Sequence, residues 1–149
     1  MTDVFQIEIF IALLLSSGAF ALALAHFYRT RPFLYVELSW DVLNLEKNTL
    51  EGVVTVTNIG IHPMFVRHVA LEMPTGSENR RLILNQPISG QRLDVGDGPE
   101  YFFFSYSNIV TSPAAWQRIR AYVEDGRGRK FYASKPPESA KRPSWTNDT

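Results

Sequence analysis

The chain has 149 residues, and its 15 Lys and Arg residues balance 15 Asp and Glu residues, so the formal net charge is zero. A length of this order predicts one domain plus attachments, and the balanced charge gives no argument for nucleic-acid binding. The sequence contains no cysteine, which excludes disulfide bonds, thiolate-bound iron–sulfur clusters and thiol nucleophiles.

An apolar run near the N-terminus predicts a membrane anchor. The run IFIALLLSSGAFALALA covers residues 9–25; with its apolar flanks the predicted helix extends over residues 4–28, after a short N-terminal segment of residues 1–3. An α-helix needs ~20 residues to cross the hydrocarbon core of a bilayer. The Ala-x-Ala pattern near the end of the run is also typical of signal-peptide cleavage sites. However, a signal peptide begins with basic residues and has a shorter apolar segment, so we expect a retained, single-pass helix.

Basic residues next to the anchor predict its orientation. No Lys or Arg precedes the apolar run, whereas Arg29 and Arg31 follow it directly. Because Lys and Arg are kept on the cytoplasmic side of a membrane, we expect the N-terminus to lie outside and the following domain to be cytoplasmic. The two arginines are also candidates for contact with lipid or with a partner subunit.

Two features of the anchor are candidates for contact with another membrane protein. Ser17, Ala21 and Ala25 lie four residues apart, and such a stripe of small side chains allows a second helix to approach closely. Alanine-rich membrane helices also produce such stripes by chance. Glu8 lies near the N-terminal boundary, where its carboxylate either reaches the headgroups or makes a polar contact with a partner helix.

After residue 33 the hydrophobic period changes from that of a helix to that of β-strands. Alternation of apolar and polar residues, β-branched content and turn residues predict seven short strands. They cover residues 34–42, 50–58, 63–73, 80–84, 100–106, 116–124 and 129–133. The sequence DGRG at residues 125–128 predicts a tight hairpin between the last two strands. Seven short strands within residues 33–134 predict an all-β, antiparallel sandwich.

The sequence VVTVTNIG, followed by PMFVRHVAL, resembles the second and third strands of bacterial immunoglobulin-like domains, in which V-x-V-x-N-x-G recurs. LDVGDGPEY resembles the turn before the fifth strand of such domains. The resemblance implies an immunoglobulin-like sandwich used for binding or spacing. The chain departs from antibody-type domains because it lacks a cysteine pair and carries Trp40 on its first strand. Within the motif, we expect Asn58 to bond to the backbone of its own turn and Gly60 to adopt a left-handed conformation.

Further candidates for contact lie in the last third of the chain. Arg118 and Arg120 are predicted to share one face of a strand, where they contact either solvent or an anionic lipid or partner. Residues 135–149 are polar and contain prolines, which predicts a flexible tail. Trp145 is the one aromatic residue of this tail and is a candidate for contact with a partner.

Motifs of enzymes and cofactor sites are missing from the sequence. The three histidines do not have the spacing of a zinc site. Neither a serine-acylation motif nor a nucleotide-binding glycine motif is present. We therefore expect no enzymatic activity, no cofactor, no bound metal and no nucleic-acid partner.

These features predict a non-enzymatic, membrane-anchored accessory or structural subunit that stabilises a larger membrane protein complex of the respiratory, photosynthetic or transport type. The expected partners are membrane lipids and other membrane protein subunits. The alternative is a membrane-tethered module for ligand binding or sensing, which needs a concave pocket with convergent polar groups.

Overall fold

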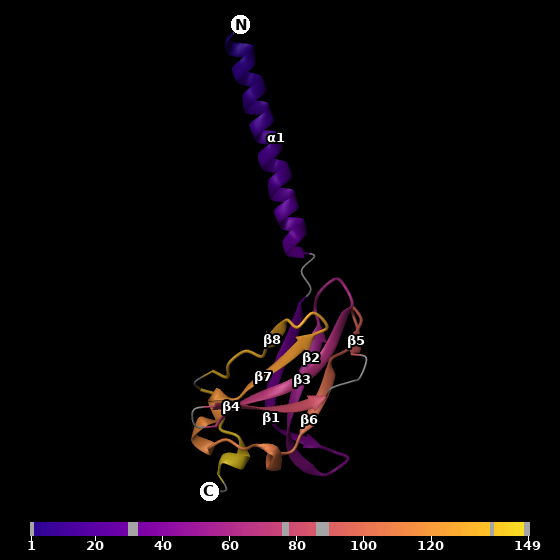
Figure 1. Ribbon diagram of the computed structural model, residues 1–149, viewed down its shortest axis with the longest axis vertical. Coiled ribbons are helices and arrows are strands. Elements are labelled where there is room, and N and C mark those ends of the chain that lie inside the picture. The colour runs from indigo at the N-terminus through magenta and orange to yellow at the C-terminus, as the bar shows by residue number, and fades with distance from the viewer. Residues whose placement is uncertain (1, 30–32, 76–77, 86–89, 138, 148–149) are drawn as a thin grey trace.

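One long helix precedes a β-domain in the computed structural model, which describes residues 2–29, 33–75, 78–85, 90–137 and 139–147 (Figure 1). The helix α1 spans Thr2–Arg29. The strands within the described ranges are β1 (Leu34–Asn44), β2 (Thr49–Asn58), β3 (Met64–Thr75), β4 (Glu78–Asn85), β5 (Gln91–Leu93), β6 (Glu100–Phe104), β7 (Arg120–Asp125) and β8 (Lys130–Tyr132). The short 3₁₀ helices are η1 (Tyr106–Asn108), η2 (Pro113–Arg118) and η3 (Ser144–Thr146).

The helix α1 projects from one end of the β-domain (Figure 1). Every described side chain from residue 6 to residue 27 is exposed. The segment Gln6–Phe27 has a mean hydropathy of 2.2 and is long and apolar enough to cross a membrane, which confirms the predicted apolar helix. The hydroxyl groups of Ser16 and Ser17 donate to backbone carbonyls one turn earlier, at 3.0 and 2.9 Å, so they do not require water.

Two antiparallel sheets form the β-domain, which confirms the predicted sandwich at this level. One sheet has the strand order β1-β2-β6, and the other has the order β4-β3-β7-β8, with β5 paired to the start of β3. Alternate residues of each strand point into the space between the sheets. The core there is built largely from β-branched and aliphatic side chains, among them Val36, Val54, Val56, Val66, Val69, Leu71, Ile119 and Val123.

Most strand ends differ from the sequence prediction by one or two residues, and two differences are larger. The strand β7 begins at Arg120 rather than at residue 116, because η2 occupies residues 113–118 and starts with Pro113, whose fixed φ favours a helical turn. Arg118 therefore lies in η2, and the prediction that it shares a strand face with Arg120 is wrong. The strand β5 is not predicted, since three residues are too few to show alternation.

The hairpin between β7 and β8 agrees with its sequence. Gly128 has a φ of 80°, and its N–H donates to the carbonyl oxygen of Asp125 at 2.9 Å. This is the left-handed conformation that glycine adopts without steric cost. The predicted tight turn is confirmed, and it places Arg127 and Arg129 at one end of the β-domain.

The turn after β2 agrees with its sequence only in part. The Oδ1 atom of Asn58 accepts the N–H of Gly60 at 3.0 Å, so the predicted bond to the turn backbone is confirmed. Gly60 does not have a positive φ, so the predicted left-handed conformation is wrong. A Cβ at Gly60 would lie 3.0 Å from the backbone nitrogen of Phe33, so close approach of the chain explains the glycine.

Candidate interaction surfaces

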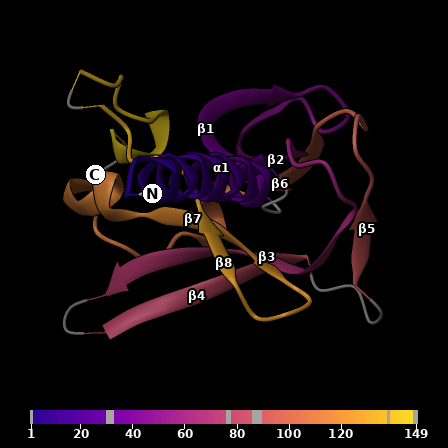
Figure 2. The same cartoon turned by 90° about the horizontal axis from the view of Figure 1, so that it is seen from above.

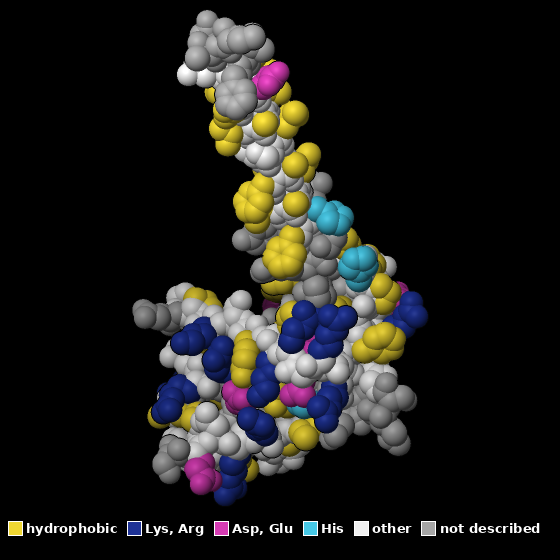
Figure 3. Space-filling model, turned by 45° about the horizontal axis from the view of Figure 1, so that its top comes forward, with side chains coloured by type: hydrophobic (Ala, Val, Ile, Leu, Met, Phe, Trp, Pro, Cys, Tyr) yellow, Lys and Arg dark blue, Asp and Glu magenta, His cyan; other side chains and the backbone are white. Residues whose placement is uncertain are grey.

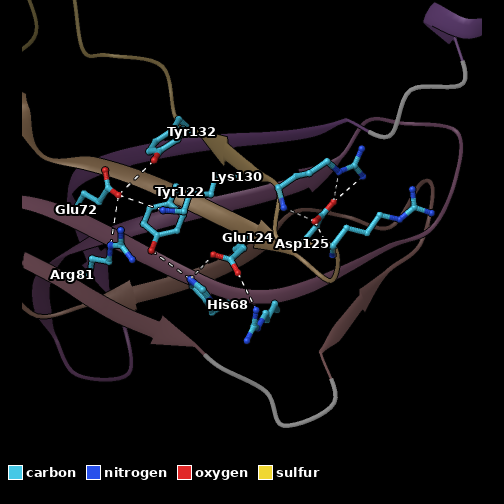
Figure 4. Close-up of polar contacts among 11 residues, drawn as sticks. His68, Glu72, Arg81, Tyr122, Glu124, Asp125, Lys130 and Tyr132 are labelled. Atoms are coloured by element: carbon cyan, nitrogen blue, oxygen red, sulfur yellow. Dashed lines mark hydrogen bonds and ion pairs between the residues drawn. The ribbon is translucent and has the colours of Figure 1, made fainter.

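The side of the β4-β3-β7-β8 sheet that faces away from the core carries charged and aromatic side chains (Figure 4). Successive residues of a strand point to opposite sides, so most of these positions alternate with the core residues of the same strands. Arg67 and His68 are consecutive, and the register of β3 against β7 shifts between Val66 and His68. We call this set the outer face; it comprises Arg67, His68 and Glu72 of β3, Arg81 of β4, Arg120, Tyr122 and Glu124 of β7, and Lys130 and Tyr132 of β8.

Tyr122 lies at the centre of the outer face and is only 1% exposed. Its ring is covered by its neighbours: the His68 ring centroid lies at 5.7 Å, the Tyr132 ring centroid at 5.5 Å, and the Lys130 ammonium at 4.6 Å. Burial raises the pKa of the Tyr122 phenol, although the neighbouring Lys130 opposes this shift. The outer face is therefore a packed layer of its own rather than a set of independent solvated side chains.

Two glutamates connect the cations of the outer face. Glu72 lies 3.8 Å from Arg81 and 3.7 Å from Lys130. Glu124 lies 3.3 Å from Arg67, and 3.6 Å from His68. Such long, partly exposed ion pairs add little stability, so they mainly fix where the charges lie.

Positive charge exceeds negative charge on the outer face. Its four Arg and Lys side chains outnumber its two glutamates, which leaves a formal excess of two positive charges. Figure 3 shows Lys and Arg side chains gathered over the visible side of the β-domain, with fewer Asp and Glu between them. Arg120, a candidate from the sequence, belongs to this face and lies 4.2 Å above the Tyr132 ring. Such a surface fits an acidic partner.

The end of the β-domain next to α1 contains a hollow of about 610 Å³. It lies between the connection from β2 to β3 and the hairpin from β7 to β8. Its lining combines polar and apolar groups: His62, Pro63, Met64, Phe65, Asp125, Gly126, Arg127 and Arg129. The sequence offered a weak signal for this hollow, since Arg127 lies in the predicted hairpin turn, Arg129 follows it and His62 precedes a predicted strand.

Asp125 holds the hairpin wall of this hollow in place. Its Oδ1 atom accepts the backbone N–H groups of Arg127 and Arg129 at 2.9 and 2.8 Å, and its Oδ2 atom accepts the Arg129 Nε–H at 2.7 Å. Burial alone would raise the pKa of Asp125, but these hydrogen bonds outweigh burial and lower it. The Arg129 side chain is therefore bound to Asp125, whereas only the backbone N–H of Arg127 is bound to it.

Part of the C-terminal tail packs on the β-domain, in contrast to the flexible tail predicted from the sequence. The Trp145 ring lies 6.1 Å from the Trp40 ring and 6.5 Å from the Tyr106 ring, and Trp40 in turn packs edge-on against Phe104 at 5.6 Å. The indole N–H of Trp145 is buried without a hydrogen-bond partner in the described part of the chain. Trp145 therefore belongs mainly to an intramolecular aromatic cluster.

The remaining residues predicted from the sequence lie on or next to α1. Ser17, Ala21 and Ala25 are exposed along one side of the helix, and Glu8 is exposed near its N-terminal end. Arg29 is the last residue of α1, but its side chain lies outside the described part. The predicted contact at Arg31 also falls outside the described residues.

No protein-family model matches the chain, and neither curated proteins nor solved structures show a significant similarity to it. Within the described ranges, no three His, Asp or Glu side chains are grouped so that they could hold a metal ion.

Proposed function

We propose that the protein is a single-pass, membrane-anchored, non-enzymatic accessory subunit that stabilises a larger membrane protein complex. The observation that carries this proposal is the surface of α1, which is apolar on every side while all its described side chains are exposed. An apolar surface of that size needs lipid or protein to cover it. A partner helix can replace lipid along Ser17, Ala21 and Ala25, because small side chains permit close packing.

We propose further that the β-domain is immunoglobulin-like. The strand order supports this: β1, β2 and β6 take the places of strands A, B and E, while β4, β3, β7 and β8 take those of C′, C, F and G. Domains of this kind present a rigid surface for binding, and the outer face is a surface of that sort. The basic residues after α1 favour a cytoplasmic position for the domain, with the N-terminus outside.

The proposed partner is another membrane protein subunit, bound by α1 and by the outer face. Complementary charges set the specificity and rate of such binding, so the excess of positive charge favours an acidic surface on the partner. The fixed positions of Glu72 and Glu124 give this surface a defined pattern instead of a diffuse charge.

Native membranes solubilised in a mild detergent test the proposal. We expect the protein to migrate with other subunits as a large complex, and migration as a free monomer of 17.0 kDa plus detergent would contradict it. The variant Arg81→Glu should weaken co-purification, because it reverses a charge on the outer face. Arg142→Glu changes an exposed arginine outside that face and should leave co-purification unaltered.

A membrane-tethered module for ligand binding or sensing is the second candidate function. The hollow at the end next to α1 favours it, since a cavity with polar groups is what such a module needs. Native mass spectrometry of the full chain tests this candidate. If the protein binds a ligand, we expect a small molecule bound to the parent chain and its loss in the variant Arg127→Gln.

A further inference from the structure

We propose that the end of the β-domain next to α1 binds the headgroups of anionic phospholipids, so that the domain is seated on the membrane surface in a fixed orientation. The occupant of the hollow between the β2–β3 connection and the β7–β8 hairpin is the phosphate of such a headgroup. The inference rests on the proposed membrane span of α1, and it goes beyond that function by assigning a lipid-binding surface to the β-domain.

Strand register places the hollow at the end of the domain next to α1. Leu34 at the start of β1 pairs with Asn58 at the end of β2, and Met64 at the start of β3 pairs with Leu93. Val66 pairs with Asp125 at the end of β7. Because the chain enters β1 directly from α1, all of these strand ends lie at the end of the domain nearest the helix, as Figure 1 shows.

Chain length keeps that end close to the membrane. Five Cα–Cα steps separate Arg29, the end of α1, from Leu34, the start of β1. An extended chain covers ~3.6 Å per residue, so the start of β1 lies at most about 18 Å from the end of the helix. The polar headgroup region is itself several ångströms deep on each side of the bilayer, and the end of the domain is therefore held within reach of it.

Large apolar side chains project from this end. Phe33 precedes β1, Ile59 and Ile61 lie in the β2–β3 connection, and Phe65 lies at the start of β3. Each of these four side chains is between 52% and 57% exposed. Side chains of this kind lower the free energy when they enter the boundary between headgroups and acyl chains. Facing bulk water, they would form an uncovered apolar patch.

Positive charge lies beside the apolar side chains, as anionic lipid requires. Arg127 and Arg129 line the hollow together with His62. Arg129 already pairs with Asp125 at 2.7 Å. The Asp125 carboxylate accepts the backbone N–H of Arg127. In the part of the chain that the structure describes, no carboxylate lies within ion-pair distance of the Arg127 guanidinium group. A phosphate in the hollow would give Arg127 a charge-assisted partner. Near α1, Figure 3 shows Lys and Arg side chains next to hydrophobic ones.

Asp125 lies in the hollow itself and is paired with Arg129, whereas Asp94 and Asp97 at the same end lie on the other side of β3. Asp94 follows β5 and pairs with Arg92 at 2.7 Å, and Asp97 accepts the backbone N–H of Asp94. The strand β5 pairs with one edge of β3, whereas β7 pairs with the opposite edge. Figure 2 shows β5 at the margin of the domain. We therefore expect the part of this end around Arg127, which is basic and apolar, to contact the lipid.

Single-cysteine labelling of the full chain tests the proposal, and the natural lack of cysteine makes the labelling specific. An environment-sensitive fluorophore is attached to Ile61→Cys and, as a control, to Leu45→Cys. Leu45 is 82% exposed in the β1–β2 connection at the opposite end of the domain. Each labelled chain is reconstituted into vesicles of phosphatidylcholine alone or of phosphatidylcholine mixed with phosphatidylglycerol, and flotation measures insertion.

In inserted chains, we expect a blue shift of the probe at residue 61 in the vesicles with phosphatidylglycerol, and a smaller shift in phosphatidylcholine alone. The probe at residue 45 should report water in both. Arg127→Gln should remove the difference between the two lipids. Arg80→Gln, the same change at an exposed arginine of β4, should preserve it.

Three results would overturn the proposal. Inserted chains in which both probes report water would show that the domain does not contact the lipid, while the membrane anchor stands. Reversal of the blue shift by soluble inorganic phosphate would assign the hollow to a free anion rather than to a headgroup. Failure of the chain to float with vesicles would contradict the anchor itself, and the lipid-binding surface with it.

Discussion

Asp41 of β1 accepts hydrogen bonds from Ser144, a residue 103 positions later in the chain, and thereby ties the C-terminal tail to the sandwich. The Ser144 backbone N–H lies 3.1 and 3.0 Å from the two carboxylate oxygens. The Tyr106 hydroxyl also donates to Asp41, at 2.9 Å, and accepts the Asp41 backbone N–H at 2.7 Å. Asp41 has a φ of 56°, a left-handed conformation in which Asp and Asn are enriched, within an irregularity of the β1–β2 register.

The variant Asp41→Asn tests the strength of this junction. Asparagine tolerates the same left-handed conformation, but it carries no charge to strengthen the bonds from Ser144 and Tyr106. We expect the free energy of unfolding to fall by about 1–2 kcal/mol. Urea unfolding of the full chain in detergent, followed by tryptophan fluorescence, measures it. Glu46→Gln, at an exposed position of the β1–β2 connection, should not change the stability; equal stability of both variants would contradict the prediction.

Acid should destabilise the β-domain through three carboxylates. Burial raises the pKa values of Asp41 and Asp125, but hydrogen bonds outweigh burial and lower both below the ordinary value of 3.8. A hydrogen bond from Asn44 lowers the pKa of Glu51 below 4.5, against the effect of burial. In each case the unfolded state binds protons more readily than the native state. The stabilisation is therefore complete above these ordinary values and is lost as the pH falls through the lowered pKa values.

Unfolding of the full chain at a series of acidic pH values checks this prediction. We expect the free energy of unfolding to decrease steadily below about pH 4.5, the ordinary pKa of the glutamate. Glu51→Gln should flatten part of this slope, because it removes one titrating group. A parent chain whose stability does not change across this range would show that the three carboxylates are not stabilised by the fold.

Alkaline titration tests the environment of Tyr106. Burial, together with the neighbouring Asp41, raises the pKa of its phenol to about 12. The native state therefore keeps the proton longer than the unfolded state, so the contribution of Tyr106 to stability is complete below pH 10 and is lost as the pH rises through about 12. The pKa of Tyr122 is also raised, so both tyrosines titrate late. We expect Tyr106→Phe to remove the part of the tyrosinate absorbance that appears near pH 12 and to leave the contribution of Tyr122. An unchanged absorbance near pH 12 in this variant would contradict the prediction.

The sequence predicts those parts of the fold that depend on local pattern. The apolar run of α1 and the alternation in β1 to β4 can be recognised in the sequence, because the hydrophobicity of each residue indicates whether its side chain is buried or exposed. The packed tail was not predictable, since a polar segment with Ser144 and Trp145 binds only because Asp41 and Trp40 lie opposite it in three dimensions. The packing of the outer face was likewise not predictable from the sequence, because its ion pairs join residues of different strands.

Gly52 pairs with Phe104 on the neighbouring strand β6, and the ring of Phe104 leaves no room for a side chain at residue 52. A Cβ at residue 52 would overlap three atoms of this ring. The ring cannot move away freely, because it packs edge-on against Trp40 at 5.6 Å. We expect Gly52→Ala to destabilise the β-domain by about 1–3 kcal/mol through overpacking. Urea unfolding checks this, and Gly98→Ala, where a Cβ meets no atom within 4 Å, should have little effect.

The small-residue stripe of α1 leads to the last prediction. Four residues advance a helix by slightly more than one turn of 3.6, so Ser17, Ala21 and Ala25 form a narrow stripe along one side. In lipid, helices associate by packing rather than by the hydrophobic effect, and small side chains allow that packing. Ala21→Ile would hold a partner helix away while the segment remains fully apolar. We therefore expect this variant to reduce co-purification with the complex but not the amount of protein in the membrane.

Ala23→Ile provides the matched control, because two residues advance a helix by roughly 200° and place Ala23 on the opposite side from Ala21. It adds the same volume and hydrophobicity, so insertion should be equal in both variants, and co-purification should remain at the parental level. Equal loss in both variants would show that added bulk anywhere on α1 interferes. Unchanged co-purification in Ala21→Ile would locate the partner contacts elsewhere; in that case Arg81→Glu on the outer face should have the larger effect, because the β-domain alone would then hold the complex together.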